Sequence, residues 1–308
     1  MSVRYGIPYM GSKNSIAEWI LSYLPKADNF YDLFCGGCAI THCAIEQRKY
    51  NNYFINDIKG EMPNGFIDCI KGKYHDDIRW ISHEEFDKQK GKGDLLVDIC
   101  FSFGNNWRKG YAYSREIEPL KRALHYAVVL GDTDPISAYL GGVCMPKLDN
   151  ITERDRRMAV IKSALKGNVN MPQHLQALSR LQSMERLCGL NDIGDNACVE
   201  SLDKISASCK SYDMVDIKPN SVIYCDIPYR ATAQYNDVQF DYDKFYDWCM
   251  AQKEPLFISE YEMPEKYFIC IAARRKKVLL NANSNSMSRV EKLFIPKHQV
   301  KNKPLTLF

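Results

Sequence analysis

A short apolar run that ends on an acid, a proline and an aromatic residue most constrains the fold of this chain. Residues 221–225 are mostly apolar and rich in β-branched and aromatic types, which is typical of a buried strand. Pro228 lacks the backbone N–H that a sheet ladder needs, so the strand must end before it. Asp226 and Tyr229 are therefore expected at a carboxyl strand end, where ligands bind in open α/β sheets. They are candidate active-site residues, with a loop acid beside a surface tyrosine as the alternative.

Length and composition indicate a globular protein larger than one typical domain. The 308 residues are 45% hydrophobic and 26% charged, which predicts a large α/β core with an additional smaller unit. No apolar run approaches the roughly 20 residues that span a bilayer. Residues 1–8 lack the basic and apolar regions of a secretory signal. We therefore expect a cytoplasmic protein that does not contact a membrane.

The twelve cysteines are scattered, which favours reduced thiols packed as small hydrophobic side chains over a disulfide framework. Cys35 and Cys38 form a CxxC motif with Cys43 nearby, and this admits a redox pair or half of a zinc site. A zinc site usually needs a second such pair, and the sequence contains none. We therefore expect no metal.

Two further strands are predicted before residue 60, each followed by residues suited to a nucleotide-like ligand. Residues 30–40 read as a strand, a glycine pair and a helix start, and the glycines let a ligand approach backbone N–H groups. The GxGxxG fingerprint of nicotinamide enzymes is absent. About 20 residues on, residues 54–57 predict a strand ending in Asp57, where this class of fold holds a ribose hydroxyl pair. A helix N-cap before Ile58 is the alternative for this acid.

Strand signals are sparse from residue 65 to residue 194, where helical patterns alternate with polar loops. Helices are expected near residues 116–130, 152–165 and 173–187. The sheet is expected to resume with strands at residues 197–201, 221–225, 256–261, 267–273, 277–280 and 291–295.

Positive charge is concentrated in three stretches, although the formal net charge is only +3. Basic residues mixed with aromatic and amide side chains suit contacts with nucleic-acid phosphates and bases. A solvated helix face is the commoner meaning of any single charge run. The stretches are residues 108–122, 154–166 and 274–303.

These pieces, in this order, resemble the Dam-type (class alpha, D12) DNA adenine N6-methyltransferases. The resemblance implies a Rossmann-like, S-adenosylmethionine-dependent methyltransferase fold with a mostly helical inserted DNA-recognition domain. Residues 1–64 and 195–308 would form the cofactor-binding and catalytic domain, and residues 65–194 the target-recognition domain. The motifs that carry the resemblance are residues 9–13, 32–37, 56–57, 226–229 and 258–261.

The resemblance also implies roles for individual residues. The catalytic motif would be Asp226, Ile227, Pro228 and Tyr229, which departs from the usual Asp-Pro-Pro-Tyr at Ile227. The adenine amino group would donate one hydrogen bond to the acid and one to the backbone carbonyl of Ile227, and Pro228 keeps that backbone extended. S-adenosylmethionine would be held by Tyr9, Lys13, Asp32, Phe34, Gly36, Asp57 and Asp226, with Glu200 and Ser201 beside its adenine.

The implied reaction is methyl transfer from S-adenosylmethionine to N6 of a flipped adenine in double-stranded DNA, at a specific short sequence. GATC is one target that the family suggests, we expect a monomer, and a partner restriction endonuclease is left open. Methyl transfer to RNA or to a protein amide is an alternative, as is a non-catalytic DNA-binding protein of the same fold. The residues expected to contact DNA are Asn106, Arg108, Arg115, Arg154, Arg156 and Arg157.

Overall fold

The structure is a computed structural model, and its backbone contacts divide the chain into two compact units. Unit 1 comprises Met1–Gly6, Ser12–Ile67 and Ile193–Phe308, and unit 2 comprises Ile7–Gly11 and Asp68–Asp192. The structure describes residues 5–9, 11–165, 184, 187, 190, 203–229, 240–279 and 286–300. Within these ranges, the side chains of residues 155, 276–279 and 286–289 are not described.

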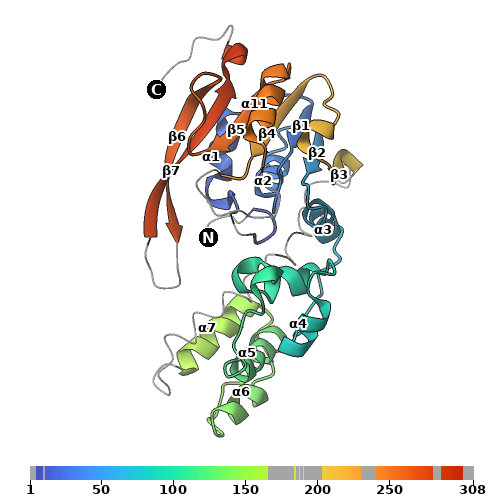
Figure 1. Ribbon diagram of the computed structural model, residues 1–308. Coiled ribbons are helices and arrows are strands. Elements are labelled where there is room, and N and C mark those ends of the chain that lie inside the picture. Colours follow the sequence, from blue (N-terminus) through green and yellow to red (C-terminus); the bar gives the residue numbers. More distant parts are fainter. Residues whose placement is uncertain are drawn as a thin grey trace. The chain divides into compact units, whose positions relative to one another are not determined.

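Unit 1 is built on a seven-stranded sheet in the order β3-β2-β1-β4-β5-β7-β6 (Figure 1). The first five strands in this order run parallel, whereas β7 is antiparallel to both β5 and β6. This arrangement confirms the predicted α/β class. The strands are β1 (Asn29–Asp32), β2 (Asn52–Asn56), β3 (Ile205–Ser208), β4 (Ser221–Asp226), β5 (Leu256–Glu260), β6 (Phe268–Leu279) and β7 (Ser286–Pro296).

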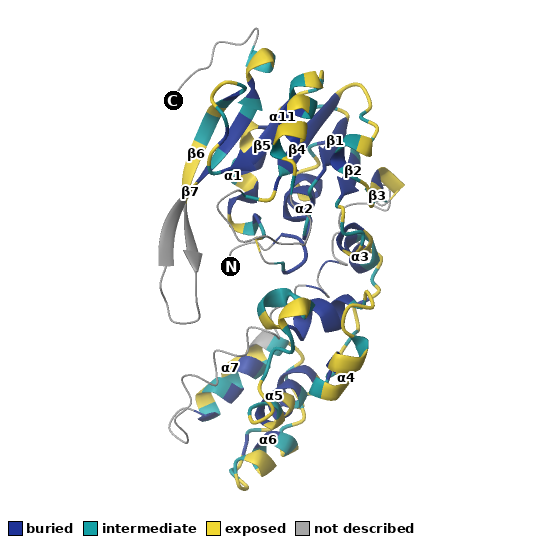
Figure 2. Cartoon of the chain, viewed as in Figure 1, coloured by how far each residue is buried: buried dark blue, intermediate teal, exposed yellow. Residues whose placement is uncertain are grey.

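The central strands are buried along nearly their whole length, as the dark blue arrows of Figure 2 show. Continuous burial is expected for parallel strands covered on both faces. On one face, helix α11 (Tyr242–Ala251) packs Phe245 and Cys249 into a core with Ile223 and Cys225 of β4. The helix begins at Asp241, whose side chain accepts a hydrogen bond from the Lys244 N–H at 3.0 Å and so satisfies one of the open donors of the first turn.

The strand order reverses between β1 and β4, and this reversal determines where a ligand can bind. Helix α2 (Ala39–Glu46) connects β1 to β2 and packs against α1 (Ala17–Tyr23). The chain continues from β1 to β2 and β3 on one side, whereas β4 and β5 lie on the other. In sheets of this kind, a ligand is expected beside the loops after β1 and β4, at the carboxyl edge of the sheet.

Unit 2 is helical in the part that the structure describes, and its longest strand feature there is an isolated bridge between Ser102 and Tyr111. Helix α3 joins it to unit 1, since the boundary between the units follows Ile67. Its role as a recognition domain stays a prediction. The helices are α3 (Glu61–Ile70), α4 (His83–Gln89), α5 (Glu118–His125), α6 (Asp134–Tyr139) and α7 (Arg154–Leu165).

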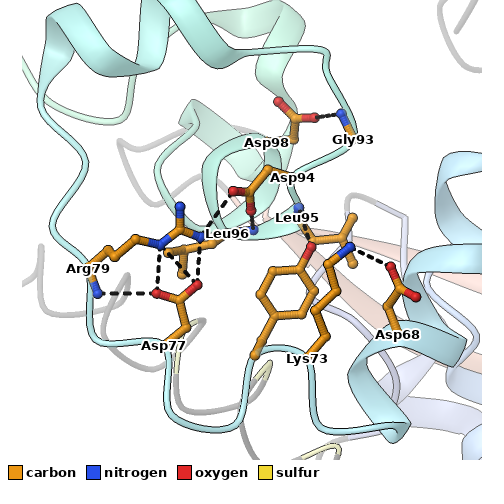
Figure 3. Close-up of polar contacts among 10 residues, drawn as sticks. Asp68, Lys73, Asp77, Arg79, Gly93, Asp94, Leu95, Leu96 and Asp98 are labelled. Atoms are coloured by element: carbon orange, nitrogen blue, oxygen red, sulfur yellow. Dashed lines mark hydrogen bonds and ion pairs between the residues drawn. The ribbon is translucent and has the colours of Figure 1, made fainter.

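A polar network fixes the loop that precedes α4 (Figure 3). The Arg79 guanidinium donates to both carboxylate oxygens of Asp77, at 2.9 and 2.6 Å, and also to Asp94 at 3.0 Å. Asp98 is buried and accepts hydrogen bonds from the N–H groups of Gly91 and Gly93. The bidentate pair with Asp77 fixes the orientation of Arg79. The two hydrogen bonds to Asp98 hold the turn at residues 90–93 in a defined conformation.

Two strand predictions differ from the structure. The strand Ile205–Ser208 was not predicted, and the strand predicted at residues 197–201 lies outside the described residues. The two strands predicted at residues 267–273 and 277–280 are one strand, β6, and that separation was wrong. The basic run at residues 274–277 resembles a loop in sequence, but the pairing with β7 continues through it.

Gly6 occupies a position where a side chain cannot fit, and this generates a stability prediction. Its φ is +67°, and an added Cβ would lie 2.2 Å from the Gly37 carbonyl oxygen and 2.7 Å from the Ala39 nitrogen. Gly6→Ala is expected to lower the free energy of unfolding by about 3 kcal/mol, because left-handed strain of about 1–2 kcal/mol adds to overpacking of about 1–3 kcal/mol.

Gly93→Ala is the matched control for a urea-unfolding measurement. Gly93 has a φ of +85°, but no atom lies within 4 Å of the added Cβ. Only the strain of about 1–2 kcal/mol is expected there. Equal losses for the two variants would contradict the proposed clash between residue 6 and the backbone at Gly37.

Candidate active site

Three carboxylates follow the carboxyl ends of three adjacent parallel strands. Asp32 ends β1, Asp57 follows β2 and Asp226 ends β4. Their charges act on one another, since Asp226 and Asp57 help to raise the pKa of Asp32, and Asp226 helps to raise that of Asp57. Three acidic side chains therefore interact with one another at the carboxyl edge where the strand order reverses.

Asp32 supports the loop after β1 from inside the protein. Burial raises its pKa to about 7, and a hydrogen bond from Thr41 Oγ1 at 2.7 Å opposes the rise. Asp32 is only 1% exposed, and its Oδ1 has no hydrogen-bond partner among the described residues. Its position beneath the loop indicates a supporting role, and direct contact with a cofactor stays a prediction.

The glycine loop after β1 is tied to the end of β2. The Gly36 N–H donates to Asp57 Oδ2 at 3.0 Å, and the Lys59 N–H donates to Asp57 Oδ1 at 3.0 Å. Gly36 has a φ of +44°, a conformation that glycine adopts readily. Asp57 therefore holds the loop and also caps a turn. Its proposed contact with a ribose stays a prediction. Burial raises the pKa of Asp57 despite these amide donors.

Phe34 packs in a cluster of aromatic side chains. The Phe34 ring is partly buried, and it contacts the rings of Tyr212, Phe240 and Phe245 with centroid separations of 5.5, 5.8 and 5.9 Å. Tyr212 follows the unpredicted strand β3. The sequence therefore identified Phe34 but missed the tyrosine that packs against it.

Lys13 forms a buried ion pair with the candidate catalytic acid. Its Nζ lies 2.7 Å from Asp226 Oδ2 and 3.9 Å from Glu291 Oε1, and Lys13 is 5% exposed. Burial acts to lower the pKa of Lys13, but the charges of Asp226 and Glu291 outweigh it and the pKa lies above its ordinary value. A protonated Lys13 thus holds one carboxylate oxygen of Asp226, and no other described residue bonds to that carboxylate.

Tyr229 is held beside this pair. Its hydroxyl donates a hydrogen bond to Glu291, and its ring lies 4.7 Å from Lys13 Nζ and 4.4 Å from the Tyr261 ring. Burial, together with the Asp226 and Glu291 charges, keeps the pKa of Tyr229 well above its ordinary value, so the hydroxyl retains its proton. The structure therefore brings together Lys13, Asp226 and Tyr229 from the predicted set.

Ile227 and Pro228 follow the strand end, with different exposure. The Ile227 side chain is buried in the core cluster that contains Ile223 and Phe245, whereas Pro228 is exposed. The carbonyl of Ile227 is thus carried by an anchored residue. The role of this carbonyl as a hydrogen-bond acceptor stays a prediction.

Glu291 is the residue of this site that the sequence did not reveal. It lies on β7, is 1% exposed and contacts both Lys13 and Tyr229. The available signal was an acid at the start of the strand predicted at residues 291–295, since buried carboxylates require partners.

The remaining predicted cofactor residues are Tyr9, Glu200 and Ser201. Tyr9 belongs to unit 2 and is partly buried. Glu200 and Ser201 lie outside the described residues. Their roles stay predictions.

The residues predicted to contact DNA differ in their environments. Arg108 and Arg115 are exposed, and the Arg108 guanidinium lies 5.2 Å from the Trp107 ring. The Asn106 side chain accepts a hydrogen bond from the Arg108 N–H at 3.1 Å. Arg154 is partly buried, and Arg156 is 75% exposed beside Glu153.

Arg157 has a structural role that the sequence did not indicate. Its guanidinium donates to the carbonyls of Ile151, Val128 and Val129, and it lies beside Gly131. These bonds satisfy carbonyls at the end of a helical segment. The guanidinium of Arg157 thus stabilises the fold, and a contact with DNA stays a prediction.

Burial raises the pKa values of Cys35 and Cys38 and makes them poor nucleophiles. Within the described ranges, no three His, Cys, Asp or Glu side chains are grouped to hold a metal ion. The helices described here include none long and apolar enough to cross a membrane.

A protein-family model matches the N-terminal part of the chain. Residues 9–121 match the sequence model of the D12 class N6 adenine-specific DNA methyltransferase family. The match includes Lys13, the glycine loop and Asp57, and it ends before β4, so it does not reach Asp226. No curated protein matches the chain. The N-terminal part of the chain is thus similar to a class of adenine-specific DNA methyltransferases, and the seven-stranded α/β sheet is consistent with a methyltransferase fold.

The environment of Asp32 predicts how stability depends on pH. Because its folded-state pKa is about 7 and its ordinary value is 3.8, the folded protein binds this proton more tightly than the unfolded chain. Stability should therefore fall as pH rises from about 4 to about 7, by at most about 1.4 kcal/mol per pH unit, and then level off. Asp32→Asn should flatten this dependence in urea-unfolding measurements at several pH values.

Thr41→Val provides the matched comparison for this prediction. The variant removes the hydrogen bond that opposes the rise in the Asp32 pKa. The decline in stability should therefore extend to higher pH than in the wild-type protein. An Asp32→Asn variant with the same pH dependence as wild type would contradict the assignment.

Proposed function

We propose that this protein transfers a methyl group from S-adenosylmethionine to N6 of adenine in double-stranded DNA. The observation that supports this most directly is the position of Asp226 at the carboxyl end of β4, with one oxygen held by Lys13 and the Tyr229 ring beside it. The match of residues 9–121 to adenine-specific DNA methyltransferases supports the choice of substrate.

The residues at the strand ends fit S-adenosylmethionine chemically. Bound there, this cofactor would supply an electrophilic methyl group on a positively charged sulfur. The acidic side chain of Asp57 at this edge would favour such a cation. Each oxygen of Asp57 accepts one backbone N–H and retains a lone pair for a ribose hydroxyl. Phe34 is only partly buried, and its ring would contact an adenine ring of the cofactor.

The chemical task of the protein is to activate a poor nucleophile. The lone pair of adenine N6 is delocalised into the ring, so the amino group must be oriented before it can attack. Asp226 Oδ1 and the Ile227 carbonyl would accept the two amino hydrogens and direct the lone pair towards the methyl group. Lys13 donates a hydrogen bond to Oδ2, which fixes the orientation of the carboxylate. Positioning and electrostatics then provide most of the catalysis.

Completion of the reaction requires the loss of one N6 proton. Asp226 already accepts an N6 hydrogen in this arrangement, so it is placed to receive the proton as the new N–C bond forms. A base within a duplex cannot reach this edge of the sheet and must be flipped out of the stack. Tyr229 would stack on the flipped adenine, a contact worth about 1–3 kcal/mol per base.

Asp226→Asn should lower the rate of methyl transfer by about 10²–10³-fold, because a preorganised charged acceptor is lost. The assay follows labelled methyl transfer to unmethylated duplex DNA and identifies N6-methyladenine by mass spectrometry. RNA and a protein lysate serve as competing acceptors. Incorporation into either of them but not into DNA would reject the proposed substrate.

Ile227→Val is the control for this experiment. The backbone carbonyl is retained, and loss of one buried methyl group costs about 1 kcal/mol of stability. Its rate should equal that of the wild-type protein under conditions where both are folded. Wild-type protein without methyl transfer, or equal rates for Asp226→Asn and wild type, would contradict the mechanism.

Glu291 is expected to set the pH range over which Lys13 works. In the wild-type protein the pKa of Lys13 is raised, so its charge persists through neutral pH and is lost only when pH exceeds that raised value. Glu291→Gln preserves a hydrogen-bond acceptor for Tyr229 but removes one of the two charges that oppose the effect of burial. The alkaline limb of the pH–rate profile should therefore move to lower pH.

The variant Lys13→Arg/Glu291→Gln tests this explanation, because arginine remains charged at all accessible pH values. Its activity should lack the shifted alkaline limb, even if its maximum rate is lower. A shift that persists in the double variant would show that another group titrates, and an unchanged profile for Glu291→Gln would exclude the proposed electrostatic role.

A further inference from the structure

Strands β6 and β7 continue past the ends of the parallel strands as a two-stranded ribbon. Pairing between β5 and β7 ends at Glu260 and Lys292. Six further residue pairs then join β6 and β7, from Arg274 with Glu291 to Leu279 with Ser286, and β5 does not extend alongside them. We call residues 274–279 and 286–291 the ribbon. At about 3.4 Å per residue it is roughly 20 Å long.

The ribbon projects from the edge of the sheet that carries the candidate active site. Because β7 is antiparallel to β5, residues before Lys292 lie beyond the carboxyl end of β5 (Figure 1). Its first residue on β7 is Glu291, which contacts Tyr229 and Lys13. The base of the ribbon is therefore part of the site, and both belong to unit 1.

The ribbon also carries a dense run of positive charge. Residues 274–277 are four consecutive cations, in a chain whose net charge is only +3. Arg274 and Arg275 are exposed, and neither forms an ion pair with any described residue. This run begins the third basic stretch, in which no individual residue was predicted to contact DNA.

Two physical explanations exist for such charges. In the first, basic residues on a projecting ribbon prevent edge-to-edge association of sheets. This role requires only that the residues are exposed to water. A phosphate-binding ribbon needs in addition that they lie where the substrate passes. The direct continuity between the ribbon and Glu291 satisfies this second condition, and arginine guanidinium groups match phosphate geometry.

We propose that the ribbon binds the phosphate backbone of duplex DNA next to the flipped adenine. The identity of the substrate rests on the proposed function, whereas the position of the contact rests on the geometry of unit 1. Phosphate contacts position a protein on the duplex without reading its sequence. The ribbon thus contributes affinity and alignment at the catalytic edge.

The test compares the binding of a fluorescein-labelled duplex by wild type and Arg274→Gln/Arg275→Gln, measured by anisotropy from about 50 to 200 mM salt. Each lost phosphate contact should reduce the slope of log affinity against log salt by about 0.9, and should lower affinity by about eightfold at 0.1 M salt. The arginine-to-lysine double variant keeps both charges and should largely retain binding.

Lys26→Gln/Lys253→Gln is the matched charge control. Both lysines are exposed and precede parallel strands, β1 and β5, so they lie at the opposite edge of the sheet. This variant should bind with the wild-type salt slope. Thermal unfolding of each variant establishes that it is folded.

The outcomes separate the ribbon from the proposed reaction. Equal affinity and slope for Arg274→Gln/Arg275→Gln and wild type overturn the ribbon proposal, whether or not DNA is methylated. A wild-type protein that binds no duplex overturns it as well. Ribbon-dependent binding without methyl transfer supports the ribbon and rejects the proposed reaction.

Discussion

The ion pair between Lys13 and Asp226 is the interaction on which the candidate site depends. A nearly buried ammonium group is tolerated only with charged partners, and here the nearest carboxylate oxygens are 2.7 and 3.9 Å away. Lys13 lies in an N-terminal turn, and its partners Asp226 and Glu291 lie on β4 and β7. Lys13 and Asp226 are 213 residues apart in sequence. One cation thereby fixes three distant chain segments around a single strand end.

Charge of opposite sign is distributed within unit 1 in a way that suits two different ligands. Asp32, Asp57 and Asp226 place acidic side chains at the ends of adjacent strands. The cations of β6 lie on a projecting ribbon instead of at these strand ends. In the proposed function, this separation lets a positively charged methyl donor and a polyanionic substrate meet at one edge without competing for the same side chains.

Strands buried on both faces were predictable from sequence, because their apolar runs are continuous. This holds for β1, β2, β4 and β5. Strand β3 was missed because only Ile205 of its four residues is buried and the rest are serine and alanine. The break predicted within β6 reflects its four cations, whose strand conformation comes from cross-strand pairing that local sequence does not encode.

The candidate site was predictable where residues belong to compact motifs, as Lys13, Asp57 and Asp226 do. Glu291 was not predictable, because its contact with Tyr229 spans 62 residues and depends on the register of β7 against its neighbours. The structural role of Arg157 was hidden for the same reason, since its partners are backbone carbonyls about 29 residues earlier in the chain.

The division of the chain has a consequence for exchanging recognition units between related proteins. The chain passes between the two units four times, after residues 6, 11, 67 and 192. Residues 7–11 belong with unit 2 although they are distant from it in sequence and adjoin Lys13. A chimera that exchanged only residues 68–192 would combine these residues from a relative with residues 7–11 of this protein in one unit. An exchange must therefore include both segments, so that all residues packed within unit 2 come from the same protein.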